Sequence, residues 1–249
     1  MKKKVACVIP ARLKSVRFPK KMLASLNGKP LLQWVWESAS KVPFFDEVVF
    51  AIDAEETAQL IRGFGGKYAM TSETCTSGTE RLVELLEKKI IDADIWVNWQ
   101  GDEPFIHEPM IRDLIQSCDH EDADVWTLKK KISNLEEVTN PHIAKVVCDS
   151  HDFALYFSRS PIPYYRDMAE DKIFYKHVGL YAFTPASLRK ISLLQHCNIE
   201  TAEKLEQLRF LYHHLRIKVH ETQYEVFGID LPEHLALAEA LLEKREVLI

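Results

Sequence analysis

Cationic side chains gather in the loop that follows the first apolar run of the sequence. The run Val5–Ile9 is typical of a buried strand, and the residues after it include Arg12, Arg17, Lys20 and Lys21. A triphosphate needs several fixed cations, because they neutralise the charge of the departing pyrophosphate. An ordinary solvated basic loop is the alternative. The pattern favours a phosphate site, although the G-x-x-x-x-G-K-[ST] signature of P-loops is absent.

A carboxylate on a glycine turn follows a later apolar run. Asp102 lies in Asn98–Pro104, directly after Ile95–Val97. Magnesium typically takes one or two protein carboxylates and completes its shell with phosphate oxygens and water. Asp102 is therefore a candidate magnesium ligand, and a plain polar turn that ends in proline is the alternative.

Two further segments combine small or acidic residues with helix starts. Ser77–Arg81 opens a helical pattern, where free backbone N–H groups could contact a base edge or a phosphate. Thr79 could equally be a plain helix cap. Asp230, in Gly228–Pro232, could be a second metal ligand or a capping acid, and its spacing alone favours the cap.

Short apolar runs alternate with segments of helical period along the chain. The expected strands are Val5–Ile9, Glu47–Ile52, Ile95–Trp99, Val125–Leu128, Ile143–Cys148, His177–Phe183 and Arg216–Glu221. The expected helices are Pro30–Ser40, Ala54–Phe64, Thr79–Ile90, Pro109–Cys118, Thr201–His214 and Pro232–Glu243. This order predicts an α/β fold with a mostly parallel sheet and helices on both faces. Ligands should then collect at the carboxyl ends of the strands.

The stretch from about 135 to 175 breaks this alternation. It contains Pro141, Pro161 and Pro163, and strand candidates flank Asp149–Asp152. We predict a single domain over residues 1–249, with a smaller lobe inserted at about 135–175.

The bulk composition excludes several classes of protein. A net charge of −5 argues against nucleic-acid binding. No apolar run reaches the roughly 18 residues of a membrane span, so we expect no membrane insertion. Five scattered cysteines fit a reducing, cytoplasmic compartment, and the ten histidines lack metal-ligand spacing. The missing G-x-G-x-x-G signature removes the main support for a dehydrogenase.

Taken together, these segments resemble the 3-deoxy-manno-octulosonate (Kdo) cytidylyltransferase family, from Val5 to about Leu242. Each motif is weak alone, but their order and spacing are specific. The motifs are Ile9-Pro-Ala-Arg12, Ser15-x-Arg-Phe-Pro19, Asn27-Gly-Lys-Pro30, Met70-Thr71, Ser77-Gly-Thr-Glu-Arg81, Val97-Asn-x-Gln-Gly-Asp-Glu-Pro104, Asn140-Pro141, Lys145-Val-Val147, Ala154-Leu-Tyr-Phe-Ser-Arg159, His177-x-Gly-x-Tyr181, Leu205-Glu-Gln-Leu-Arg209 and Asp230-x-Pro-Glu233.

The resemblance implies that the mostly parallel sheet is a nucleotide-binding sheet and that residues 1–249 form a single nucleotidyltransferase domain. It also implies a homodimeric enzyme that uses Mg²⁺ to transfer CMP from CTP to Kdo, a 3-deoxy-ulosonic acid sugar, with the smaller lobe used for dimerisation. By this resemblance Arg12 and Lys21 are triphosphate ligands, Asp102 binds the catalytic Mg²⁺ and Asp230 is the second metal ligand. The segment that resembles the cytosine site contains Gly78, Thr79 and Arg81. The positions that match the sugar-acid site are Gln100, Arg159, His177, Tyr181, Glu206 and Gln207.

One loop departs from the family pattern. Lys20 stands where the family usually has glycine, and Met22 where it has proline. Lys20 could therefore compete with Lys21 for the phosphate role. Two other functions remain as alternatives to a Kdo cytidylyltransferase. One is a cytidylyltransferase for a related acid, such as 8-amino-Kdo or a nonulosonic acid. The other is a catalytically weak nucleotide-binding regulator. The intact Asp102 and Asp230 speak against the regulator.

Overall fold

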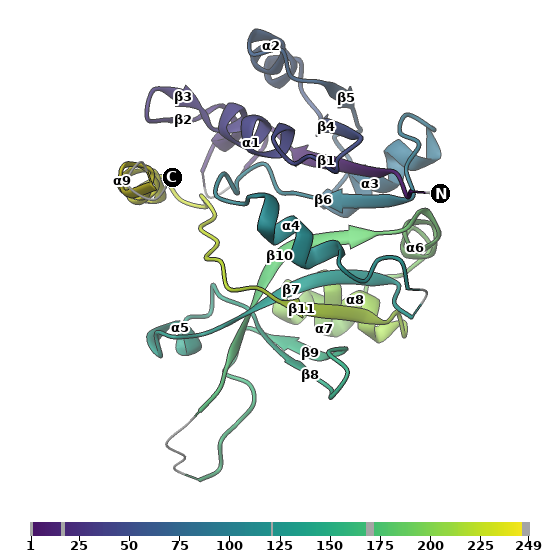
Figure 1. The fold of residues 1–249 in the computed structure, drawn as a ribbon, viewed down its shortest axis with the longest axis vertical. Coiled ribbons are helices and arrows are strands. Elements are labelled where there is room, and N and C mark those ends of the chain that lie inside the picture. Colours follow the sequence, from purple (N-terminus) through teal and green to yellow (C-terminus); the bar gives the residue numbers. More distant parts are fainter. Residues whose placement is uncertain (1, 16–17, 121, 168–171, 246–249) are drawn as a thin grey trace. The chain divides into compact units, whose positions relative to one another are not determined.

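The computed structural model describes residues 2–15, 18–120, 122–167 and 172–245 (Figure 1). The chain forms two compact units, which we describe separately. Unit 1 consists of Met1–Pro109 and Val226–Ile249, and unit 2 consists of Met110–Glu225. The stretch 135–175 lies within unit 2, and its assignment as a lobe inserted into a single domain stays a prediction.

The main sheet of unit 1 is built from parallel strand pairs. Its strands, in spatial order, are β6 (Ile95–Asn98), β1 (Val5–Ala11), β4 (Glu47–Ile52) and β5 (Tyr68–Met70). Every residue of β1 is buried, which explains why an uninterrupted apolar run forms this strand. Because β1 and β6 run in parallel as neighbours, the segments that follow them leave the same edge of the sheet.

Helices flank this sheet. They are α1 (Leu31–Ser40), α2 (Glu55–Gly63) and α3 (Gly78–Glu87), while the short elements η1 (Lys21–Leu23), β2 (Ser25–Leu26) and β3 (Lys29–Pro30) lie between β1 and α1 in the chain. α1 contacts β4, and α3 contacts β1, β4 and β6. α1 buries Leu31, Leu32, Val35 and Ala39. This spacing puts one apolar face of the helix against the core.

The end of the chain returns to this unit as a loop and helix α9 (Glu233–Arg245). Ile229 and Ala238 are fully buried in a cluster with Leu26, Leu31 and Phe105. The backbone N–H of Ile229 also donates to the carbonyl oxygen of Asp102 at 2.8 Å. The closing segment is therefore fixed beside the loop that follows β6.

The strands of unit 2 pair around β7 (Val125–Lys131). β7 is parallel to β11 (Ile217–Glu221) and antiparallel to β10 (Tyr175–Phe183), whereas β8 (Lys145–Cys148) pairs with β10 and with β9 (Ala154–Ser158). The helices are α4 (Glu108–Ile115, which begins in unit 1), α5 (Glu136–Thr139), α6 (Pro185–Ile191), α7 (Asn198–Glu203) and α8 (Gln207–Tyr212). Together with the parallel sheet of unit 1, these elements confirm the predicted α/β class.

Two features of unit 2 differ from the sequence expectation. The single helix expected over Thr201–His214 is wrong, because Lys204 adopts a left-handed conformation (φ 54°) that separates α7 from α8. α6 was not expected at all. It begins with a reciprocal capping box, in which Thr184 and Ser187 each accept from the other's backbone N–H.

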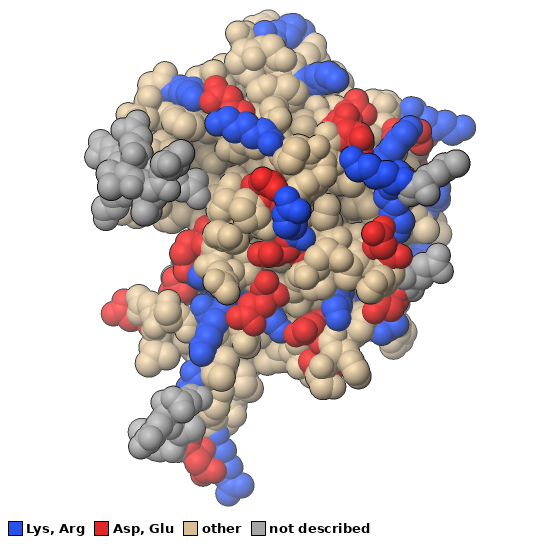
Figure 2. Space-filling model, viewed as in Figure 1, with Lys and Arg blue, Asp and Glu red and all other residues tan. Residues whose placement is uncertain are grey.

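The surface and the thiols agree with the bulk composition. On the face shown in Figure 2, basic and acidic side chains are interspersed in small groups. All five cysteines are free thiols. None of the helices in the described ranges is long and apolar enough to cross a bilayer.

Candidate functional site

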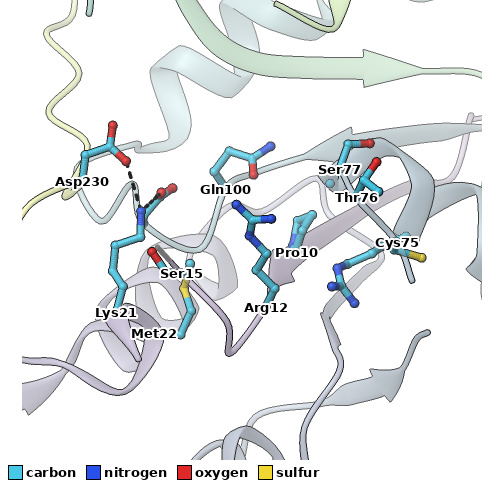
Figure 3. A pocket seen from close by; sticks show the side chains of 13 residues that line it. Pro10, Arg12, Ser15, Lys21, Met22, Cys75, Thr76, Ser77, Gln100 and Asp230 are labelled. Atoms are coloured by element: carbon cyan, nitrogen blue, oxygen red, sulfur yellow. Dashed lines mark hydrogen bonds and ion pairs between the residues drawn. The ribbon is translucent and has the colours of Figure 1, made fainter. Parts of the chain in front are cut away.

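A cavity of about 300 Å³ lies in unit 1, where the ends of β1 and β6 and the start of α3 contribute its walls (Figure 3). Most of the unit 1 residues predicted for the site line it. They are Arg12, Lys21, Gly78, Arg81, Gln100, Asp102 and Asp230. The rule that ligands bind at the carboxyl ends of parallel strands therefore located the cavity correctly.

The acidic end of this cavity is organised around one ammonium group. Lys21 is only 6% exposed, and its Nζ contacts Oδ2 of Asp102 and lies 3.2 Å from Oδ1 of Asp230. Asp230 comes from the closing segment, and Leu231 and Pro232 separate it from α9. The structure thus brings both predicted acids to a single cation.

This arrangement fits a magnesium site. Two carboxylates that converge on one positive centre supply the number of protein ligands that Mg²⁺ usually takes, with phosphate and water to complete the shell. Within the described ranges, no group of three or more His, Cys, Asp or Glu side chains is arranged to hold a metal ion. A metal with an all-protein coordination shell therefore has no obvious site there, whereas Mg²⁺ shared with a nucleotide does.

A third carboxyl group lies close to this pair. Burial raises the pKa of Glu103 to about 8, and the charges of Asp102 and Asp230 add to the effect. Its Oε2 is buried without a hydrogen-bond partner among the described residues. Glu103 is therefore mostly protonated at neutral pH, which limits the negative charge gathered beside Lys21.

Arg12 occupies the middle of the cavity in Figure 3, with Lys21 and Asp230 on one side and Ser77 on the other. It is exposed and follows β1 directly. No hydrogen bond or ion pair joins it to another residue in the part of the chain that the structure describes. A cation that points into a cavity without a protein partner is well placed to bind an anionic ligand.

Two glycines allow the chain to approach closely at this site. A Cβ atom on Gly101 would lie 3.0 Å from the carbonyl oxygen of Pro10. A Cβ atom on Gly78 would lie 3.1 Å from the ring of Pro10 and 3.2 Å from the amide nitrogen of Gln100. A larger residue at Gly101 or Gly78 would push the end of β1, the loop after β6 and the start of α3 apart.

Ser77, not Thr79, caps α3. The Ser77 hydroxyl accepts the N–H of Glu80 at 3.2 Å, so the capping interpretation of Thr79 is wrong. Thr79 is 2% exposed and does not line the cavity. At the helix start, Ser77 and Gly78 therefore border the cavity, whereas Thr79 does not.

Arg81 lines the cavity but is already bound by protein groups. Its guanidinium donates to Oδ2 of Asp53 at 2.8 Å, to Thr71 Oγ1 at 2.5 Å and to the carbonyl of Ser72 at 3.3 Å. Asp53 also accepts the backbone N–H of Leu13 at 2.9 Å. Because Asp53 accepts from both Leu13 and Arg81, it links the loop after β1 to helix α3.

Removing the negative charge of the Arg81–Asp53 pair should lower the stability of the protein. The Arg81 and Asp53 side chains are only 2% and 8% exposed. We expect Asp53→Asn to lower the free energy of unfolding by about 3 kcal/mol, because it leaves a buried guanidinium without a counter-charge. Urea denaturation measures this, with Glu73→Gln as the control because the Lys14–Glu73 pair is largely exposed. Equal losses in both variants would contradict the assignment.

The other predicted residues lie in unit 2. Arg159 follows β9, and its guanidinium donates to backbone carbonyls of Glu203 (2.7 Å), Pro141 (2.9 Å), His142 (3.4 Å) and Lys204 (3.4 Å). Carbonyl oxygens fix the direction of the guanidinium but do not cancel its charge. The prediction that Arg159 binds a carboxylate is therefore compatible with these contacts and stays a prediction.

His177, Tyr181 and Gln207 are brought together within unit 2. The rings of His177 and Tyr181, both on β10, have centroids 5.4 Å apart. Nε2 of Gln207, the first residue of α8, lies 3.5 Å from Nδ1 of His177. Glu206 accepts from the guanidinium of Arg209 at 2.9 Å. His177 and Tyr181 thus come from β10 and Gln207 from α8, two elements that are distant in sequence, and Glu206 directly precedes α8.

Some residues in the cavity or beside it were not predicted individually. Asp53 does not line the cavity but accepts from Arg81, and it directly follows β4, so its position at a strand end could have suggested a role. Arg17, expected in the phosphate loop, lies outside the described residues. The remaining lining residues carry no signal beyond their neighbours, and they are Pro10, Ser15, Met22, Cys75, Thr76 and Ser77.

A parallel sheet with cations and paired carboxylates at its carboxyl edge defines the class of nucleotide-binding transferases. Comparisons with known proteins specify the family. A family model described as cytidylyltransferase matches residues 6–217. A 3-deoxy-manno-octulosonate cytidylyltransferase of Thermodesulfovibrio yellowstonii is 42% identical over 95% of this chain and 97% of its own. One of Porphyromonas gingivalis is 43% identical over 98% and 99%.

A solved structure agrees with these sequences. It is that of a CMP:2-keto-3-deoxy-manno-octonic acid synthetase complexed with CTP, with a TM-score of 0.91 and 40% identity over 97% of this chain and 99% of its own. The chain belongs to the 3-deoxy-manno-octulosonate cytidylyltransferase family, and it is a nucleotidyltransferase.

Proposed function

We propose that this protein transfers CMP from CTP to Kdo and releases pyrophosphate. The 2-hydroxyl oxygen of Kdo forms a bond to the α-phosphorus, the bond from that phosphorus to the β-phosphate oxygen breaks, and the hydroxyl proton is released. The observation that supports this most strongly is the cavity of unit 1. Arg12, Lys21 and two convergent carboxylates all line it, in a chain whose relatives carry this activity in their names.

In this proposal Asp102 and Asp230 hold Mg²⁺. When bound, Mg²⁺ supplies positive charge that stabilises the phosphate oxygens. Lys21 already holds the two carboxylates together, and it offsets their mutual repulsion. Arg12, exposed in the cavity, neutralises the leaving pyrophosphate together with Lys21.

Residues of unit 2 suit the sugar acid. Arg159 suits the carboxylate, because a guanidinium can bind both carboxylate oxygens at once. The neighbouring polar side chains, His177, Tyr181, Glu206 and Gln207, suit hydroxyl groups.

A pyrophosphate-release assay tests the reaction and the sugar together. Purified protein is incubated with CTP and Mg²⁺ and with Kdo, 8-amino-Kdo or N-acetylneuraminate, one at a time. Kdo should give the highest kcat/KM. A preference for another acid would replace Kdo in the proposal, and no release with any of the three would reject the proposed activity.

The choice of nucleotide is a separate prediction. We expect CTP to exceed UTP by at least about tenfold in kcat/KM, because donors and acceptors matched to cytosine are left unpaired against uracil. The segment expected to contact the base begins at Gly78, where the α3 backbone borders the cavity. Competition kinetics with both nucleotides measures the ratio. Equal values would mean that this segment does not recognise the base.

Two further proposals concern the assembly and setting of the protein. We propose a cytoplasmic homodimer that supplies CMP-Kdo for lipopolysaccharide or capsule synthesis. In its support, Leu155 and Tyr164 within the predicted lobe are 61% and 87% exposed, so both side chains are available to contribute apolar area to an interface. Sedimentation velocity at micromolar concentration should show a dimer, and a monomer would contradict the proposal.

A further inference from the structure

A buried hydroxyl group lies behind the predicted sugar-acid residues of unit 2. Thr127, in the centre of β7, is 0% exposed. Its Oγ1 lies 2.9 Å from Nε2 of His177, 3.1 Å from the carbonyl oxygen of Val178 and 2.9 Å from that of Leu180. None of the sequence motifs includes this residue.

A β-bulge creates this arrangement. In the pairing of β10 with β7, Leu128 faces Val178 but Thr127 faces Tyr181, so two extra residues of β10 intervene. The bulge turns the carbonyl oxygens of Val178 and Leu180 toward the same hydroxyl group. Bulges of this kind often re-aim side chains beside functional sites.

The surroundings of the Thr127 hydroxyl group determine the direction of each hydrogen bond. The two carbonyl oxygens can only accept, so the single hydroxyl proton of Thr127 goes to one of them. The remaining neighbour, Nε2 of His177, must then donate its proton to Thr127 Oγ1. The reverse direction would leave both carbonyl oxygens facing the lone pairs of the hydroxyl oxygen.

The protonation of Nε2 fixes the other side of the ring. Burial lowers the pKa of His177 to about 3, so the ring is neutral and carries one proton only. With that proton on Nε2, Nδ1 is an acceptor, and it faces the Gln207 side chain at 3.5 Å. The NH₂ end of the Gln207 amide must therefore point at His177. Its carbonyl oxygen and its second N–H remain for other partners.

We propose that Thr127 is a positioning residue for the sugar-acid site: it selects the Nε2–H tautomer of His177, and through His177 it orients the Gln207 amide toward the substrate. The proposal rests on the proposed function for the identity of the substrate. The ring of Phe157 also restricts His177, with centroids 4.9 Å apart in an edge-on contact. Packing thus fixes the ring plane, and Thr127 fixes its protons.

The test compares three full-length variants with the wild-type protein. Thr127→Val keeps the shape but removes the hydroxyl, and Thr127→Ser restores it. Thr57→Val is the matched control, because Thr57 is also 0% exposed but its hydroxyl has no partner among the described residues. The tautomer is read by NMR of ¹⁵N-histidine-labelled protein, with His177→Gln used to assign the signal.

Wild type, Thr127→Ser and Thr57→Val should all show the Nε2–H tautomer of His177. Thr127→Val should populate the Nδ1–H form, and its KM for the sugar acid should rise about three- to tenfold, the loss expected for one misdirected hydrogen bond. Its KM for CTP should stay within about twofold of wild type, since a misdirected Gln207 affects only the sugar-acid site. The Ser variant should recover the wild-type KM.

Three results would overturn the proposal: an Nδ1–H ring in the wild type, an unchanged tautomer in Thr127→Val, or a changed tautomer with an unchanged KM for the sugar acid. A wild-type protein that is inactive with every ulosonic acid would instead reject the proposed function. The NMR measurement would then still decide whether Thr127 sets the tautomer.

Discussion

Replacing Lys21 by alanine is expected to lower kcat by about 30- to 1,000-fold, the loss of about 2–4 kcal/mol of transition-state stabilisation. Lys21 is buried and holds Asp102 and Asp230 with one ammonium group. Its removal takes away a cation from the developing pyrophosphate and leaves two carboxylates facing each other. Steady-state pyrophosphate release, with a melting curve to confirm folding, measures the effect.

Lys20 is the matched control for this experiment. Its side chain is 60% exposed and pairs with Glu56, also largely exposed, so Lys20→Ala should change kcat by less than about fivefold. Lys20 also has a left-handed backbone (φ 53°), a conformation that glycine adopts without strain. Lys20→Gly should therefore retain activity. A larger loss from Lys20→Ala than from Lys21→Ala would show that Lys20 is the phosphate ligand.

Strands β1, β4 and β6 of unit 1 could be predicted because burial on both faces leaves a simple pattern, whereas the short strand β5 (Tyr68–Met70) was missed. β1 and β4 are continuous apolar runs, and Glu47–Ile52 was predicted with the observed bounds. The break in the helix expected over Thr201–His214 could not be predicted, because it depends on one lysine in a left-handed conformation that has no sequence signature. α6 did carry a signal, since Thr184, Pro185 and Ser187 form a helix start.

The residues of the site also divide into those that could be predicted from the sequence and those that could not. The positions of Arg12 and Asp102 at the cavity could be predicted, because Arg12 directly follows β1 and Asp102 lies in the loop after β6, and both strands are buried in one parallel sheet. Asp230 was ambiguous by spacing, because its role depends on a closing segment that returns through the buried contacts of Ile229. Thr127 gave no signal, since a threonine within a strand is ordinary. Only the bulge in β10, a three-dimensional feature, gives its hydroxyl group a special position.

The replacement of Asp102 or Asp230 by asparagine should have the largest effect on the reaction. Each change removes one negative charge and nearly preserves shape, and kcat should fall by about 10²- to 10⁴-fold in either variant. Both carboxylates already converge on Lys21, so we expect them to bind Mg²⁺ as one unit. Because a unit fails when either part is lost, the double variant should be little slower than either single variant.

The melting temperature should distinguish the single variants from the double variant. After either single change, Lys21 keeps one carboxylate partner, so the melting temperature should change little. In the double variant a side chain that is only 8% exposed loses both counter-charges, and the melting temperature should fall clearly below that of both single variants. Asp92→Asn is the control, because Asp92 is 95% exposed and pairs with Lys4 at the surface.

A magnesium titration of kcat in each variant completes the experiment. The variants should need more Mg²⁺ than wild type to reach their lower maximum, since one ligand is missing. If Asp230→Asn keeps a normal kcat and a normal magnesium requirement, Asp230 serves only to hold Lys21. Asp102 would then be the single protein ligand of the metal, and the two-carboxylate site would be wrong.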